Sequence, residues 1–241
     1  MDRGRALARL GRREPRGRLL TRPRALVLTG RGRYEDPWHD HAATSHVVAS
    51  LLGEQGVDAQ VRSAFPDAFG DLEAFDLLVV NAGRGRSDAA FDGDDAAWAP
   101  AHEAVRVFAA GGGALLGLHQ AANTFADSPH WAGILGGRWV PGTSMHPPQD
   151  VATFTPVGDH PVVAGLGPVV ADDERYCLLD VAPTSTVLLT AHHDGVDHPV
   201  AWVSAGARAV YDGLGHGVES YASPSRRELL RREVGWLLGT R

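Results

Sequence analysis

Short apolar runs alternate with amphipathic segments through the first half of the chain. Four runs of strand length are followed by glycine or polar residues, and two intervening segments have apolar residues at helical spacing. This alternation predicts an α/β fold with a mostly parallel sheet and helices on both faces, and right-handed crossovers make it doubly wound. The predicted strands are Ala25–Gly30, Val57–Val61, Phe75–Asn81 and Ala114–Leu118, and the predicted helices are Thr44–Gln55 and Ala96–Ala110.

The second half of the chain is less regular. Asp159–Gly167 is typical of a turn and a short helix. Ser225–Leu238 is a final amphipathic helix, with Ser223 or Ser225 as its capping residue. No repeat or long linker is present, so we expect one domain over residues 25–241. The strand-like segments are Val151–Phe154, Val187–Thr190, Val200–Val203 and Ala209–Tyr211.

The first 24 residues differ in composition from the rest. They hold nine of the 23 basic residues, all arginine, against Asp2 and Glu14. We interpret residues 1–24 as a disordered arginine-rich tail, with a basic arm for nucleic acid or an acidic partner as the alternative. The tail lacks the continuous apolar core of a secretory signal, so we expect a cytoplasmic protein.

Composition excludes several classes of protein. The chain has 241 residues, 44% of them hydrophobic, which is enough for a buried core. Cys177 is the only cysteine, so the chain is not a disulfide scaffold. The net charge is −6, and because the tail holds +7, residues 25–241 hold −13, which argues against nucleic-acid binding. The chain has no apolar stretch of ~18 residues and no dinucleotide or P-loop motif, so we expect no membrane partner and no nucleotide cofactor.

Histidines follow several of the predicted strands. His39 lies in the loop after the first strand, and His119 follows the fourth strand at a sharp turn. His216 comes after Gly213-Leu214-Gly215, beyond the last strand-like segment. Sites of parallel α/β sheets lie at the carboxyl ends of the strands, so we expect these three histidines at one edge. An imidazole there can act as acid, base or metal ligand, or it can simply bond to nearby backbone.

Other polar residues provide further candidates. Glu174 ends the acidic run Asp172–Glu174, which is either a solvated surface or the source of a base or metal ligand. Asp40 is placed to cap the following helix or to contact a substrate. Prolines fix the backbone after His146, which we interpret as a rigid wall of a pocket. His192-His193-Asp194-Gly195 is typical of an exposed turn.

Several short motifs occur in a fixed order along the chain. They are Trp38-His39-Asp40, Gly111–His119, Leu135–Trp139, His146, Asp159-His160-Pro161, Asp173–Tyr176, Pro199–Trp202, Gly206–Tyr211, Leu214-Gly215-His216 and the terminal helix ending near Trp236. In this order, they resemble the ThuA-like family, named for trehalose utilisation, within the class I glutamine amidotransferase-like superfamily. The resemblance covers about residues 25–240. The sequence departs from the family pattern at Asp212, where Thr or Asn is expected, and at Gln120 and Ala207.

The resemblance implies a flavodoxin-like sheet with a pocket at its carboxyl edge. In class I amidotransferases, the turn after the corresponding strand holds a nucleophilic cysteine. His119 occupies that position here, so glutaminase activity is not expected. The family is associated with sugar catabolism, including disaccharides oxidised to 3-keto forms. We therefore expect a small-molecule sugar as substrate, and a homo-oligomer stays open.

The resemblance also implies which residues form the site. His119, Glu174 and His216 would line the pocket as catalytic residues with His39 nearby. The same three residues suit a divalent metal such as zinc or manganese, although the sequence has neither Cys-x-x-Cys nor His-Glu-x-x-His. We expect acid–base or metal-assisted isomerisation, elimination or hydrolysis of a sugar derivative. Substrate contacts are expected from Trp38, Asp40, Gln120, His146 and Tyr176, with Trp38 and Tyr176 stacking on a sugar ring.

Two other functions remain open at this level. One is a carbohydrate-binding or regulatory protein that retains the pocket without catalysis, and the other is a hydrolase in which Glu174 activates water. Clustered ionisable residues favour an enzyme, since groups with perturbed pKa values gather where chemistry is done. A binding protein would use aromatic and neutral hydrogen-bonding side chains instead.

Overall fold

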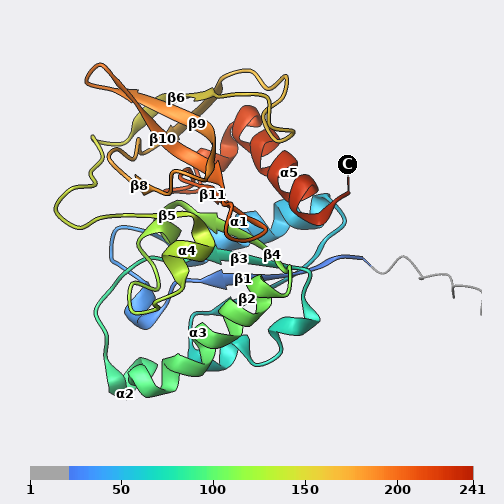
Figure 1. Cartoon of the computed structure of the whole chain (residues 1–241), viewed down its shortest axis with the longest axis vertical. Coiled ribbons are helices and arrows are strands. Elements are labelled where there is room, and N and C mark those ends of the chain that lie inside the picture. The colour runs from blue at the N-terminus through green and yellow to red at the C-terminus, as the bar shows by residue number, and fades with distance from the viewer. Residues whose placement is uncertain (1–21, 241) are drawn as a thin grey trace, which may run out of the picture.

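A nine-stranded sheet runs through residues 22–240, the part of the chain that the computed structural model describes (Figure 1). Its strand order is β2-β1-β3-β4-β11-β10-β9-β6-β7. The first five strands pair in parallel, and the others join in antiparallel pairs. The strands are β1 (Arg24–Thr29), β2 (Asp58–Ser63), β3 (Leu77–Asn81), β4 (Ala114–Leu118), β6 (Asp150–Pro156), β7 (Val169–Asp173), β9 (Thr186–His193), β10 (Val196–Val203) and β11 (Ala209–Asp212), with β5 (Gly137–Arg138) and β8 (Asp180–Val181) forming a separate pair.

Helices cover both faces of the parallel part of the sheet. Successive side chains of a strand point to opposite faces, so Val27 of β1 belongs to the core beneath α1 and α5. Leu26 and Leu28 belong to the core beneath α3 and α4. The helices are α1 (His41–Glu54), α2 (Ala89–Asp92), α3 (Asp95–Ala110), α4 (Trp131–Leu135) and α5 (Pro224–Leu238), with short 3-10 turns η1 (Gly32–Tyr34), η2 (Pro66–Phe69), η3 (Leu72–Ala74), η4 (His119–Ala122) and η5 (Ser220–Ala222).

This architecture confirms the predicted α/β class, with a parallel central sheet and helices on both faces. β11 is the last strand along the chain, and it pairs in parallel with β4 in the middle of the sheet. β9 and β10 form a hairpin whose turn is Asp194-Gly195, and these two residues are exposed. His192 and His193 lie inside β9 rather than in the turn, and His193 is half-buried.

Some local predictions need correction. Asp159–Gly167 forms turns without a helix, because Gly165 has a φ of +68°, which does not continue a helix. Ser223 is the cap of α5: its side chain accepts from the Arg226 amide. Of the disordered tail predicted over residues 1–24, residues 1–21 lie outside the described residues. Its last residue, Arg24, begins β1.

No helix within residues 22–240 combines the length and the apolar character that a membrane span requires.

Candidate active site

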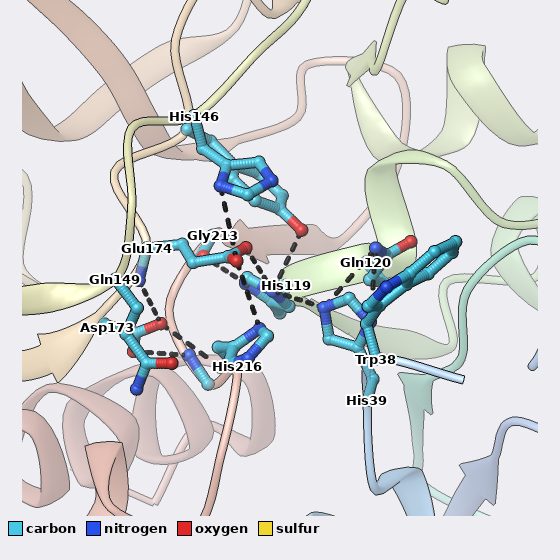
Figure 2. A network of polar contacts seen from close by, with 12 residues as sticks. Trp38, His39, His119, Gln120, His146, Gln149, Asp173, Glu174, Gly213 and His216 are labelled. Atoms are coloured by element: carbon cyan, nitrogen blue, oxygen red, sulfur yellow. Dashed lines mark hydrogen bonds and ion pairs between the residues drawn. The ribbon is translucent and has the colours of Figure 1, made fainter. Parts of the chain in front are cut away.

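Four side chains from four segments converge at the carboxyl ends of the strands (Figure 2). His39 follows β1, His119 follows β4, Glu174 follows β7 and His216 follows β11. The sheet explains part of this convergence, because β1, β4 and β11 all belong to its parallel part, so their carboxyl ends lie at the same edge. The expected edge location of the three histidines is therefore correct, and Glu174 joins them.

The backbone at His119 holds its imidazole in one orientation. Its φ of +45° is uncommon for a residue other than glycine, and it turns the chain sharply from β4 into η4. The Tyr211 hydroxyl donates to the His119 carbonyl at 2.8 Å. The ring is buried, and its Nδ1–H donates to the Gly213 carbonyl at 2.8 Å. Nε2 of His119 therefore has its lone pair directed into the cluster.

His39 is oriented in the same way by a residue that the sequence analysis missed. Its Nδ1–H donates to the Asp36 carboxylate at 2.6 Å, so Nε2 is the atom directed at the cluster. That Nε2 lies 3.1 Å from Nε2 of His119. Burial lowers the pKa of His39 despite the opposing effect of Asp36. The Nε2 atoms of His39 and His119 therefore face each other, an arrangement that a shared proton or cation stabilises.

Glu174 supplies negative charge to this cluster. Its Oε2 lies 3.4 Å from Nε2 of His119, and its Oε1 lies 3.5 Å from Nδ1 of His216. Burial raises the pKa of Glu174, but the nearby imidazoles of His119 and His216 outweigh burial and hold the pKa well below its ordinary value. The nearby Glu174 carboxylate raises the pKa of His216. The carboxylate is therefore ionised at neutral pH.

These donors fit a divalent cation. One ligand atom from each of His39, His119, Glu174 and His216 lies within 4.8 Å of the other three. A tetrahedral zinc site with Zn–N bonds of about 2.0–2.1 Å separates neighbouring ligands by roughly 3.3–3.4 Å, close to the shortest spacings here. The second nitrogen of a ligating histidine usually donates to a carboxylate or carbonyl, as His39 and His119 do. The cluster could hold a metal ion, and His39 extends the three-residue set expected from the sequence.

The expected substrate contacts are distributed unevenly around the cluster. The exposed His146 has its Nδ1 3.3 Å from Oε1 of Glu174. Trp38 is 77% exposed beside His39. The Gln120 amide lies 3.4 Å from Nε2 of His39. Asp40 is the cap of α1, where its side chain accepts from the Ala43 amide at 2.9 Å, and no contact of Asp40 with the cluster is recorded among the described residues.

Tyr176 contacts the cluster through its hydroxyl group. The phenol donates to Nε2 of His119 at 2.9 Å. Its ring is buried against the rings of His119 and Trp139, with centroids 4.5 and 4.9 Å away. The expected stacking of Tyr176 on a sugar is therefore wrong, because protein rings already cover it. Burial holds the pKa of Tyr176 well above its ordinary value, so the phenol is a neutral donor.

His41, which packs against His39, is another residue that the sequence analysis missed. The His41 ring is stacked on His39 with centroids 5.6 Å apart and an interplanar angle of 8°. Burial lowers the pKa of His41 to about 4, so it is neutral at neutral pH. In the sequence, His41 simply follows the predicted capping residue Asp40, and nothing there indicates that its ring packs against His39.

Replacing Asp36 tests whether the orientation of His39 matters. We expect Asp36→Asn to weaken Zn²⁺ or Mn²⁺ binding by about 10- to 100-fold, because it removes the carboxylate that fixes the ligating tautomer. Isothermal titration calorimetry measures this loss. Asp40→Asn is the matched control in the same loop, since asparagine also caps helices, and its affinity should equal that of the wild type. Equal affinities for all three proteins would contradict the role of Asp36.

Comparisons with known proteins agree with this fold. The sequence model of the ThuA family, described as trehalose utilisation, matches residues 24–237. A ThuA-like protein from Parabacteroides merdae has a TM-score of 0.72 at 17% identity, over 91% of each chain. One from Bacteroides uniformis has a TM-score of 0.70 at 17% identity, over 93% of this chain and 95% of that one. A glutamine amidotransferase from Thermotoga maritima has a TM-score of 0.57 at 11% identity, over 90% of this chain and 99% of that one. No curated protein matches the sequence.

The family match extends over nearly the whole described chain, and the chain therefore belongs to the ThuA family. The structural likenesses show that it shares the glutamine amidotransferase-like fold. The chain's single cysteine is not at the turn after β4: Cys177 is buried, and burial raises the pKa of its thiol.

Proposed function

We propose that this ThuA-family protein is an enzyme that binds a divalent metal through His39, His119, Glu174 and His216 and acts on an oxidised disaccharide. The convergence of these four donors within 4.8 Å is the observation that supports the proposal. Family membership supports a carbohydrate substrate, since the family is described by trehalose utilisation. Because a histidine replaces the nucleophilic cysteine of amidotransferases, the proposal includes no glutaminase activity.

The ligand set favours zinc or manganese. Imidazole and carboxylate together bind both ions, and the absence of thiolate from these four residues leaves manganese in competition with zinc. A bound divalent ion would supply Lewis-acid polarisation of a substrate oxygen. The protein's own residues would supply orientation and proton transfer.

Proton transfer is assigned to side chains next to the ligands. A keto-sugar has an acidic hydrogen on the carbon beside its carbonyl, and removal of that hydrogen permits isomerisation or elimination of the glycosidic bond. His146 suits the role of base, because its ring is exposed and touches Glu174 without belonging to the donor set. Tyr176 suits the role of hydrogen-bond donor, because its phenol stays protonated. Trp38 offers an exposed ring for the sugar beside His39.

Deuterium uptake tests this reaction directly. The metal-loaded protein is incubated in D₂O with trehalose oxidised to a ketone at carbon 3 of one ring, and products are followed by mass spectrometry. We expect deuterium beside the carbonyl together with isomerised or cleaved sugar. His146→Gln should slow this uptake by about 100- to 10,000-fold, the usual contribution of a general base, with the metal retained.

The outcomes separate the alternatives. His130→Gln, which changes an exposed histidine outside the cluster, is the matched control and should exchange at the wild-type rate. Calorimetric affinity for the sugar without deuterium uptake or product would instead support a carbohydrate-binding protein that lacks catalysis. Neither affinity nor turnover with keto-disaccharides would contradict the proposed substrate class.

A further inference from the structure

A buried carboxylate outside the donor set joins two segments of the site. Asp173 is the last residue of β7 and is fully buried. Its Oδ1 accepts the backbone amides of Glu174 at 2.9 Å and of His216 at 3.1 Å, and its Oδ2 accepts the amide of Gly215 at 2.7 Å. Within residues 22–240 no ion pair of Asp173 is recorded, so backbone amides are its recorded partners (Figure 2).

The sheet alone does not bring these segments together. β7 is an edge strand of the sheet, and β10, β9 and β6 lie between it and β11. Glu174 and His216 therefore leave strands that do not pair with each other. The Asp173 carboxylate connects the backbone of both segments directly.

The conformation of Gly215 makes this connection possible. Its φ of +118° is a region that residues with a side chain rarely adopt. With this turn, the successive amides of Gly215 and His216 point at one carboxylate, a concave arrangement of N–H groups that binds anions. The position of His216 relative to Glu174 is thus set by a carboxylate that needs both of its oxygens as acceptors.

We infer that Asp173 is a positioning residue that fixes the spacing between Glu174 and His216 and thereby sets the metal affinity of the site. The inference rests on the proposed metal-binding function. Asparagine at this position has nearly the same shape but only one acceptor oxygen. Its NH₂ group would face at least one of the three amides, and the loop from Gly213 to His216 would move away from Glu174.

The test measures position and affinity separately in Asp173→Asn. Amide hydrogen exchange of Gly215 and His216, followed by NMR in the metal-free protein, reports on position. Titration with Co²⁺ reports on affinity and, through its visible absorption, on coordination geometry. We expect exchange at both amides to speed up and Co²⁺ binding to weaken by about 10- to 100-fold, the usual effect of removing an outer-shell partner.

Asp76→Asn is the matched control, because Asp76 also accepts a backbone amide, that of Arg24 at 2.9 Å, at the opposite end of the strands. It should leave both readouts at their wild-type values. Unchanged exchange and unchanged affinity in Asp173→Asn would overturn the inference. If wild type itself binds no Co²⁺, the metal site and the affinity role are both contradicted, and the exchange of Gly215 and His216 alone decides the positioning role.

Gly215→Ala provides a second variant in case Asp173→Asn does not fold. It misaligns the two amides without changing the carboxylate, because alanine is strained at this φ. Like Asp173→Asn, Gly215→Ala should weaken Co²⁺ binding. Wild-type affinity in a folded Gly215→Ala protein would also overturn the inference.

Discussion

Replacing His119 with asparagine is expected to weaken zinc binding by on the order of 100-fold or more. Structural zinc sites bind with about 10–16 kcal/mol from four ligands, so one ligand contributes roughly 3 kcal/mol. Asparagine is chosen because it tolerates positive φ better than most residues, and His119 has a φ of +45°. Its amide can also donate to the Gly213 carbonyl in place of Nδ1–H, so the fold should be retained.

Elemental mass spectrometry and calorimetry on untagged protein measure this loss. His102→Asn is the matched control, since His102 is a largely buried histidine whose ring contacts the Tyr34 hydroxyl at 2.9 Å and does not belong to the four-residue cluster. It should bind zinc with wild-type affinity. A folded His119→Asn protein with undiminished zinc binding would exclude His119 as a ligand.

Removing the charge of Arg226 is expected to cost about 3–5 kcal/mol of stability, the usual penalty for breaking a buried ion pair. Arg226 on α5 and Asp212 at the end of β11 are both fully buried, 2.8 Å apart. Glu233, also fully buried, adds a second carboxyl group, and burial holds its pKa well above the ordinary value. Arg226→Met keeps most of the side-chain volume and leaves Asp212 without its cation.

Urea unfolding at two pH values checks this prediction. Burial already raises the pKa of Asp212, and loss of Arg226 should raise it further. A carboxyl group with a raised folded-state pKa binds more protons when folded, so its destabilising effect grows as pH rises above the unfolded value near 3.9. The penalty should therefore be larger at pH 8 than at pH 5. The double variant Asp212→Asn/Arg226→Met should recover part of it, and a penalty below about 1 kcal/mol would contradict the role of the pair.

Local pattern was sufficient to predict the parallel part of the fold and the edge at which His39, His119 and His216 lie. Buried parallel strands have continuous apolar runs, and their carboxyl ends meet at one edge, so the three histidines that follow such strands could be expected there. The helix after His39 could be predicted from the helical spacing of its apolar residues, and Asp40 before it has the chemistry of a cap.

The supporting residues could not be predicted, because their roles depend on contacts between distant segments. Asp36 lies in a polar loop, and Asp173 lies in an acidic run that is typical of a solvated surface, yet both are acceptors for groups in the site. Tyr176 looked like a stacking residue until the structure placed Trp139 and His119 against its ring. The antiparallel strands from β10 to β7 are joined by pairings that their short apolar segments did not specify.

A crystal structure of the protein incubated with Zn²⁺, with anomalous data collected at the zinc absorption edge, tests the metal centre most directly. We predict one strong anomalous peak at about 2.0–2.2 Å from the ligand atoms of His39, His119, Glu174 and His216. Zinc bound at full occupancy elsewhere, with these four side chains in the contacts described above, would contradict the account. So would a zinc-soaked crystal without any peak at this edge of the sheet.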